Sequence, residues 1–153
     1  MHPGIHAAEV PDKPAYIMAN SGQVVSYREL NEASNRGAQL FRSLGLGLGD
    51  NIAIFMENNA AFLQICWAAH RAGLYYTCIS SYLMAEEVAY IVGNCGARVF
   101  ITSEAKAEVA AELEVRREDP VNSATRRVII RRHWNVFSFL FKVRSRIFCS
   151  RAL

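Results

Sequence analysis

Short apolar runs alternate with helix-like segments along this chain, and the alternation leaves few folds open to it. Three apolar runs stand at residues 51–58, 74–80 and 97–102, with the letters NIAIFMEN, LYYTCIS and ARVFIT. A helical pattern separates each run from the next, and glycines stand in the turns. Strands and helices that alternate in this way build a sheet of largely parallel strands. We therefore predict an α/β fold, a partial layered structure with helices flanking that sheet.

A hairpin and a capped helix precede the first of these runs. Apolar residues on both sides of Asn20, Ser21 and Gly22 predict an N-terminal β-hairpin, because these three are turn residues. Ser26, with Glu29 three residues later, forms a capping box that predicts the start of a helix. The apolar stripe that follows has helical spacing and consists of Leu30, Ala33, Gly37, Leu40, Phe41 and Leu44.

Three glycines alternate with leucines in SLGLGLGD, residues 43–50, and their spacing is similar to that of a phosphate-binding loop. Such a loop must follow a strand and open a helix, because the amides at a helix N-terminus hold the phosphate. Here Gly45, Gly47 and Gly49 follow the predicted helix and precede a strand. The stretch is therefore predicted to end a helix and turn the chain into the strand.

The later helical segments differ in how apolar they are. Residues 59–73, around Phe62, Ile65 and Trp67, are apolar almost all round, so we expect this helix to be covered on most sides. Ser103 is expected to cap a helix over residues 104–113. The helix within residues 84–96 is expected to bury Val88, Ile91, Val92 and Cys95 and to end at Gly96.

Four segments in series resemble the opening of the adenylate-forming acyl-CoA synthetases, the AMP-dependent synthetases and ligases. They cover residues 11–17, 24–58, 62–80 and 86–102. The most specific pieces are Tyr-x-x-Leu at Tyr27–Leu30, Gly-Asp at Gly49–Asp50 and Ala-x-x-x-Ala-Gly at Ala68–Gly73. Their order and separations are similar to the family's across residues 10–113. Within the family, these segments are most similar to the fatty-acyl or aromatic acyl-CoA ligases. This resemblance implies a role in fatty acid metabolism.

The resemblance implies a ligase that joins a carboxylic acid to ATP, releases pyrophosphate and then transfers the acyl group from AMP to coenzyme A. ATP, Mg²⁺ and coenzyme A are therefore implied for the intact family. The chain departs from the family in length, and nothing in it resembles the phosphate loop or the adenylate-binding motifs. None of Lys13, Lys106 and Lys142 stands in the context of the family's catalytic lysine. We assign no catalytic, cofactor-binding or metal-binding residue here, and we expect the chain to be an inactive fragment on its own.

Charge divides the chain near residue 114. Residues 1–113 carry seven Lys and Arg against eleven Asp and Glu, whereas residues 114–153 carry ten against three. We take residues 1–113 as the N-terminal part of a synthetase large domain. Residues 114–153 are taken as a basic, non-matching tail that is disordered or comes from a frameshift.

Two alternatives to the fragment stay open. The chain could be a non-catalytic interaction protein whose basic aromatic tail binds nucleic acid or an anionic membrane, as basic residues interleaved with Phe and Trp sometimes do. No nucleic-acid fold accompanies these residues, which makes this role the less favoured one. A separately encoded remainder could also complete a split enzyme. For the fragment we expect self-association through exposed apolar surface around residues 59–73.

Several lone side chains have both a functional and a structural interpretation. Ser80–Ser81 could be nucleophiles, but no Asp and His pair is placed to activate them, so a solvated turn is favoured. His70–Arg71 could bind an anion, although they also suit the negative end of their own helix. Lys106 could lie near the phosphates of the coenzyme in an intact relative, but an exposed charge is favoured. Glu86–Glu87 are adjacent on a helix and point apart, so a solvated face explains them.

The cysteines and the first residues of the chain indicate the cellular compartment of the protein. Cys66, Cys78, Cys95 and Cys149 form no Cys-x-x-Cys pair or metal cluster, so we expect reduced, packed thiols. The first residues lack the pattern of a signal peptide, and no apolar run is long enough to span a membrane. Together these features predict a cytoplasmic protein.

Overall fold

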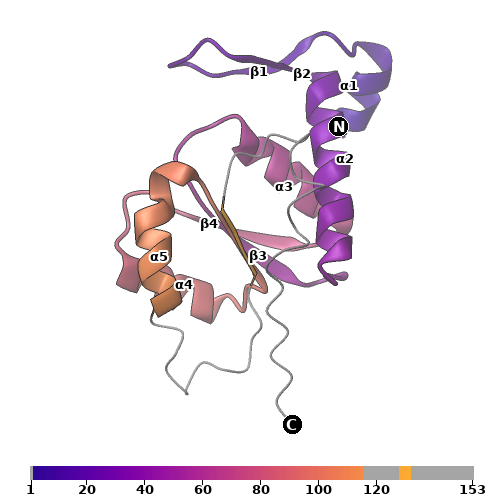
Figure 1. Ribbon diagram of the computed structural model, residues 1–153. Coiled ribbons are helices and arrows are strands. Elements are labelled where there is room, and N and C mark those ends of the chain that lie inside the picture. Colours follow the sequence, from indigo (N-terminus) through magenta and orange to yellow (C-terminus); the bar gives the residue numbers. More distant parts are fainter. Residues whose placement is uncertain (1, 116–127, 132–153) are drawn as a thin grey trace.

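Four parallel strands form the centre of the structure, in the spatial order β4–β3–β5–β6. The computed structural model describes residues 2–115 and 128–131 (Figure 1). The strands are β3 (Asn51–Phe55), β4 (Tyr75–Ile79), β5 (Val99–Thr102) and β6 (Val128–Arg131). In register, Ile52 of β3 lies between Tyr76 of β4 and Val99 of β5. The predicted parallel sheet is confirmed.

Helices cover both faces of this sheet, so the fold has three layers. α2 (Tyr27–Ser43) and α3 (Ala61–Ala72) lie on one face, and α4 (Ala85–Asn94) and α5 (Ala107–Val115) lie on the other (Figure 1). Alternate residues of β3 supply the two cores, because successive strand side chains point to opposite faces. Ile54 packs with Phe41 and Ile65 on the α2–α3 face, whereas Phe55 packs with Val88 on the α4–α5 face.

A β-hairpin stands apart from the main sheet, beyond the N-terminal end of α2 (Figure 1). β1 (Pro14–Ile17) pairs antiparallel with β2 (Val24–Ser26), which confirms the predicted hairpin. The capping box is also confirmed, because the Ser26 N–H donates to Glu29 Oε2 at 2.8 Å and the Glu29 N–H donates to Ser26 Oγ at 3.2 Å. The hairpin is tied to the three-layer body where the Tyr16 hydroxyl donates to the carbonyl of Ala60, at 2.6 Å.

A short helix near the chain start, α1 (Pro3–Glu9), was not expected from the sequence. Pro3 occupies the first turn of the helix, where its missing N–H removes no hydrogen bond. His2 caps the helix by accepting a hydrogen bond from the Gly4 N–H at its Nδ1, at 3.0 Å. Because α1 is only seven residues long, it gives almost no periodic signal.

The glycine-rich stretch ends α2 and leads into β3, as predicted. Gly45 and Gly49 have φ angles of 76° and 84°, in the left-handed region that glycine adopts without strain. Asp50 holds the turn, because its Oδ2 accepts from the Gly47 N–H at 2.7 Å and from Arg98 Nη1 at 2.5 Å. The Gly47 hydrogen bond is the main cause of a lowered pKa of Asp50. The glycine-rich stretch therefore reverses the direction of the chain between α2 and β3.

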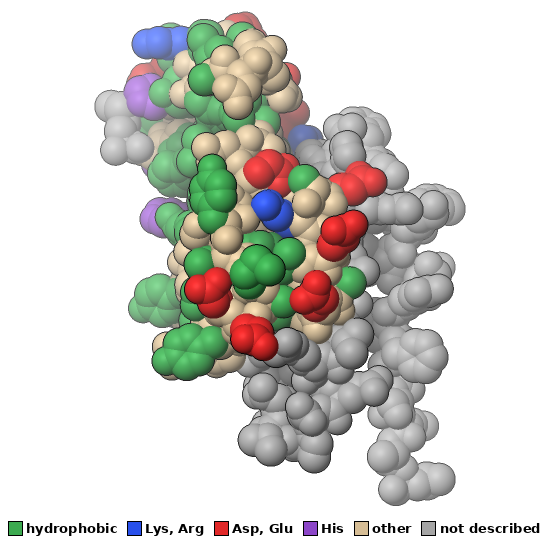
Figure 2. Space-filling view, turned by 90° about the vertical axis from the view of Figure 1, so that its left-hand side faces the viewer, with side chains coloured by type: hydrophobic (Ala, Val, Ile, Leu, Met, Phe, Trp, Pro, Cys, Tyr) green, Lys and Arg blue, Asp and Glu red, His purple; other side chains and the backbone are tan. Residues whose placement is uncertain are grey.

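Two details differ from the sequence-based expectations. Ser103 makes no side-chain cap, and a 3₁₀ turn, η1 (Glu104–Lys106), precedes α5. On α3, Ile65 is fully buried and both Phe62 and Trp67 are half-buried, so this helix is largely covered. Large apolar side chains are exposed on several of the described elements. They are Tyr75 and Tyr76 on β4, Tyr82, Met84 and Tyr90 on or around α4, Leu48 in the glycine-rich turn, Ile17 and Val24 on the hairpin, Ile5 and Val10 at α1, and Leu63 on α3 itself. On the face drawn in Figure 2, apolar side chains stand among acidic ones.

The residues after 113 are described only in part. α5 continues to Val115, and β6 pairs with β5 as a fourth parallel strand. The proposed tail at residues 114–153 otherwise lies outside the described residues, as do its aromatic positions and Cys149. Within the described part of the chain, no helix has the length and apolar character needed to cross a bilayer.

Candidate functional site

The chain reverses its winding direction between β3 and β5. After β3 the chain crosses to α3 on one face, and after β5 it crosses to α5 on the other. In open parallel sheets, ligands bind outside the carboxyl ends of the strands at such a switch point. The residues that follow Phe55 and Thr102 therefore form the first place to look for a site.

Four polar side chains gather at this switch point. The Ser103 hydroxyl, just past β5, donates to Oε2 of Glu57, just past β3. Asn59 Nδ2 donates to Glu57 Oε1 at 3.0 Å, while its Oδ1 accepts from the Ala61 N–H at 2.9 Å. Asn59 thus connects Glu57 to the first turn of α3. We call Glu57, Asn59, Ser103 and Lys106 the switch-point cluster.

Glu57 is ionised in this cluster. Partial burial opposes its charge, but the hydrogen bonds from Ser103 and Asn59 and the positive charge of Lys106 outweigh burial. They hold the pKa of Glu57 below its usual 4.5. At neutral pH, the two oxygens of the Glu57 carboxylate accept hydrogen bonds from Asn59 and Ser103.

The cluster does not fit the phosphates of a nucleotide. A carboxylate at this point repels a phosphate, and the turn after β3, residues 56–60, has no glycine to let backbone amides approach one. Among residues 2–115 and 128–131, no three His, Cys, Asp or Glu side chains gather where they could hold a metal ion. What the cluster can do is tie the end of β3 to the turn after β5.

Replacing Glu57 with Gln tests this assignment. Because the pKa of Glu57 is lowered on folding, its charge stabilises the folded state above pH 4.5, and the contribution is lost as pH falls through the folded pKa. We expect Glu57→Gln to be less stable than wild type at pH 7 and nearly equal to it at pH 3. Urea unfolding at both pH values measures the difference. A gap of the same size at both pH values would contradict the assignment.

Arg71 is engaged within the fold. Its Nε donates to Ser34 Oγ at 2.9 Å and its Nη2 donates to Asn31 Oδ1 at 2.5 Å, so it links α3 to α2. Ser34 is fully buried. His70 contacts Trp67, with ring centroids 5.3 Å apart. Of the predicted His70–Arg71 pair, Arg71 therefore acts as a cross-link between helices.

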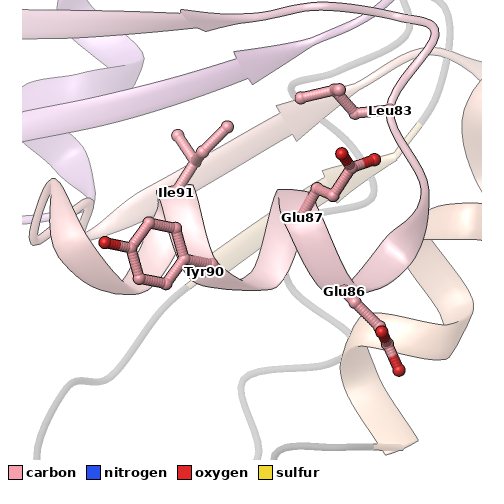
Figure 3. A pocket seen from close by; sticks show the side chains of 5 residues that line it. All are labelled: Leu83, Glu86, Glu87, Tyr90 and Ile91. Atoms are coloured by element: carbon pink, nitrogen blue, oxygen red, sulfur yellow. The ribbon is translucent and has the colours of Figure 1, made fainter.

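The remaining candidates lie at turns and helix ends. Ser80 is exposed in the turn after β4, where its Oγ accepts from the Tyr82 N–H at 3.4 Å. Glu87 caps α4, because its Oε2 accepts from the Met84 N–H at 3.0 Å, which a purely solvated face does not explain. Glu86 and Glu87 point in different directions in Figure 3. With Leu83, Tyr90 and Ile91 they line a depression of about 510 Å³.

A parallel sheet wound in both directions, with helices on each face, defines a doubly wound α/β fold. A family described as "AMP-binding enzyme" matches residues 5–139, which is most of the chain. This protein belongs to that family, and the resemblance seen in the sequence is confirmed. The match extends past residue 113 and includes β6.

The curated relatives are ligases and a transport protein of greater length. Crotonobetaine/carnitine--CoA ligase of Proteus mirabilis is 36% identical over 102 residues, covering 63% of this chain and 20% of the relative. Long-chain-fatty-acid--CoA ligase FadD13 of Mycobacterium tuberculosis is 27% identical over 110 residues, covering 72% and 22%. Long-chain fatty acid transport protein 1 of Bos taurus is 32% identical over 103 residues, covering 67% and 16%. The chain thus spans about a fifth of the length of such relatives.

Solved structures have the same fold. The N-terminal domain of FACL13 from Mycobacterium tuberculosis superposes with a TM-score of 0.73 at 24% identity, over 84% of this chain and 32% of that one. The anthranilate CoA ligase AuaEII superposes with a TM-score of 0.69 at 17% identity, over 84% and 24%. At these identities the likeness concerns the fold alone.

Proposed function

We propose that this chain is the N-terminal part of the large domain of an AMP-forming acyl-CoA ligase. The observation that carries the proposal is the family match over residues 5–139, together with relatives named as CoA ligases. The complete reaction would join a carboxylic acid to coenzyme A, converting ATP to AMP and pyrophosphate. For the acyl group we propose a fatty acid or a related acid, as in the name of FadD13.

The described residues are proposed to be a structural part of that enzyme, without the catalytic groups. Adenylation requires donors that position the transferring phosphate and neutralise its charge, and Mg²⁺ beside it. The switch-point cluster fits neither the phosphate nor Mg²⁺, because Asn59 and Ser103 already donate hydrogen bonds to the two oxygens of its Glu57 carboxylate. ATP, Mg²⁺ and coenzyme A would therefore be held by residues other than these.

The experiment is an ATP–pyrophosphate exchange assay on the purified chain with a panel of carboxylic acids. We expect exchange no higher than in a buffer control, because catalysis depends on groups held in place around the phosphate. A full-length relative assayed beside it shows that the assay works. Exchange above the control that disappears when Mg²⁺ is removed would overturn the proposal of an inactive part.

We also propose that the isolated chain self-associates through apolar side chains exposed on β4 and around α4, among them Tyr75, Tyr76, Tyr82 and Tyr90, with Tyr75 and Tyr76 on opposite faces of the sheet. Moderate salt should not reverse this, because salt strengthens apolar association. Light scattering at two salt concentrations measures it. A monomer that binds a polyanion, with an affinity that falls steeply with salt, would instead favour the interaction protein with a binding tail.

A further inference from the structure

Two cysteines lie on the α2–α3 side of the sheet, one on α3 and one on β4. Cys66 lies on α3 and packs in the same core cluster as Ile54 of β3. Ile54 is paired in register with Cys78 of the edge strand β4, so the neighbouring strand brings Cys78 to the same place. Each thiol also lies close enough to shift the pKa of the other. Cys66 is 8% exposed, whereas Cys78 is exposed, contrary to the expectation of packed thiols.

We propose that Cys66 and Cys78 are a redox-responsive thiol pair that closes to a disulfide between α3 and β4 when the chain meets a hydroperoxide. This inference does not depend on the proposed ligase function. Both cysteines are free in the structure, so the pair is in its reduced state. The other described cysteine, Cys95, packs against the α4–α5 core on the opposite face of the sheet.

The chemistry proceeds in two steps. The exposed Cys78 sulfur, as its thiolate, attacks the peroxide, the O–O bond breaks, and Cys78 sulfenic acid and water form. The Cys66 sulfur then attacks the Cys78 sulfur, the S–O bond breaks, and the disulfide and a second water form. The two thiols lose two electrons and two protons in total, and one hydrogen peroxide becomes two waters.

The surroundings set how readily the pair reacts. Burial, and then the neighbouring Cys78, raise the pKa of Cys66 to about 12. Burial also raises the pKa of Cys78, and the neighbouring Cys66 offsets only part of that rise. Tyr76 lies on the same face of β4, and Cys66, burial and Cys78 together raise its pKa. Since the thiolate is the reactive form, the pair should respond to peroxide in excess and resist low concentrations.

The test uses the full chain with Cys95→Ser and Cys149→Ser, which leaves only the two proposed partners. After treatment with excess hydrogen peroxide, we expect the monomer to lose both free thiols. Peptide mapping should then find one cross-linked peptide that contains Cys66 and Cys78, and dithiothreitol should restore both thiols. The control adds Cys78→Ser, which should leave Cys66 free under the same treatment because it is buried.

A second measurement detects the disulfide through its effect on thermal stability. Closing the disulfide should raise the thermal midpoint of the Cys95→Ser/Cys149→Ser chain, and dithiothreitol should reverse the rise. The chain with Cys78→Ser should show no rise. The proposal is overturned if both thiols stay free while glutathione in the same tube is oxidised. It is equally overturned if Cys78 goes only to a disulfide between molecules or to sulfinic acid.

Discussion

Phe55→Ala is expected to lower the free energy of unfolding by about 3–5 kcal/mol. Phe55 lies at the end of the central strand and is fully buried. Its ring stacks on Phe100 of β5, with centroids 6.2 Å apart, and packs in the same cluster as Val88 of α4. Truncation removes this apolar contact and leaves a cavity between the sheet and the helix. Urea unfolding followed by circular dichroism measures the loss.

Tyr82→Ala is the matched control for an aromatic truncation. Tyr82 is 93% exposed, so its loss should change the free energy of unfolding by no more than about 0.5 kcal/mol. If Phe55→Ala is too unstable to purify, Phe55→Leu should show a smaller loss, because it keeps part of the volume. Equal stabilities for Phe55→Ala and Tyr82→Ala would mean that the α4–α5 core is not formed as described.

Arg71→Ala should cost about 2–3 kcal/mol of folding stability, since hydrogen bonds from a charged donor contribute about 1.5–3 kcal/mol. The guanidinium of Arg71 bridges Ser34 and Asn31 between α3 and α2. Because Ser34 is fully buried, water cannot replace the hydrogen bond that its hydroxyl oxygen accepts from Arg71. Arg71→Lys should recover only part of the loss, because an ammonium lacks the planar fork that reaches both acceptors.

Arg36→Ala is the control for removal of an arginine from the same region. Arg36 forms an exposed pair with Glu32 one turn away, at 3.5 Å, which should contribute less than about 0.5 kcal/mol. Urea midpoints of the three arginine variants separate the two roles. If Arg71→Ala weakened binding of inorganic phosphate while leaving the midpoint unchanged, Arg71 would be an anion site instead of a cross-link.

Local signals made much of this fold predictable from the sequence. Ser26 and Glu29 are three residues apart, and the turns at Gly45 and Gly49 depend on neighbouring residues alone. The same holds for the alternation of strand and helix, which is enough to predict a parallel sheet. The fold class, the hairpin and the family resemblance can therefore all be predicted from the sequence alone.

Hydrophobic periodicity alone does not predict the switch-point cluster, because Glu57 and Ser103 are distant in the sequence. Glu57 and Ser103 meet only because β3 and β5 are neighbours, with β4 placed outside them. Hydrophobic periodicity does not report the order of strands in a sheet. A usable signal was present, however, since both residues come directly after a strand. Asking which polar residues follow the strands would have found the cluster.

The sequence also misplaced the exposed apolar surface. The run LYYTCIS has the β-branched and aromatic residues of a strand, and no periodicity in it distinguishes an edge strand from a central one. Among the described strands β4 lies at the edge of the sheet, and its Tyr75 and Tyr76 are 70% and 44% exposed. The apolar helix α3 was expected to expose such a surface, but α2 and the sheet cover it.

The position of β4 has a consequence for biosynthesis. If this chain is the first part of a longer ligase, its three layers leave the ribosome well before the segments that would follow. Throughout that interval the outer backbone edge of β4 pairs with no other described strand, and several exposed tyrosines lie beside it. Such an edge is a template for strand addition by a neighbouring nascent chain. Slow elongation just after this segment would then lengthen the time for which the edge is open to such pairing.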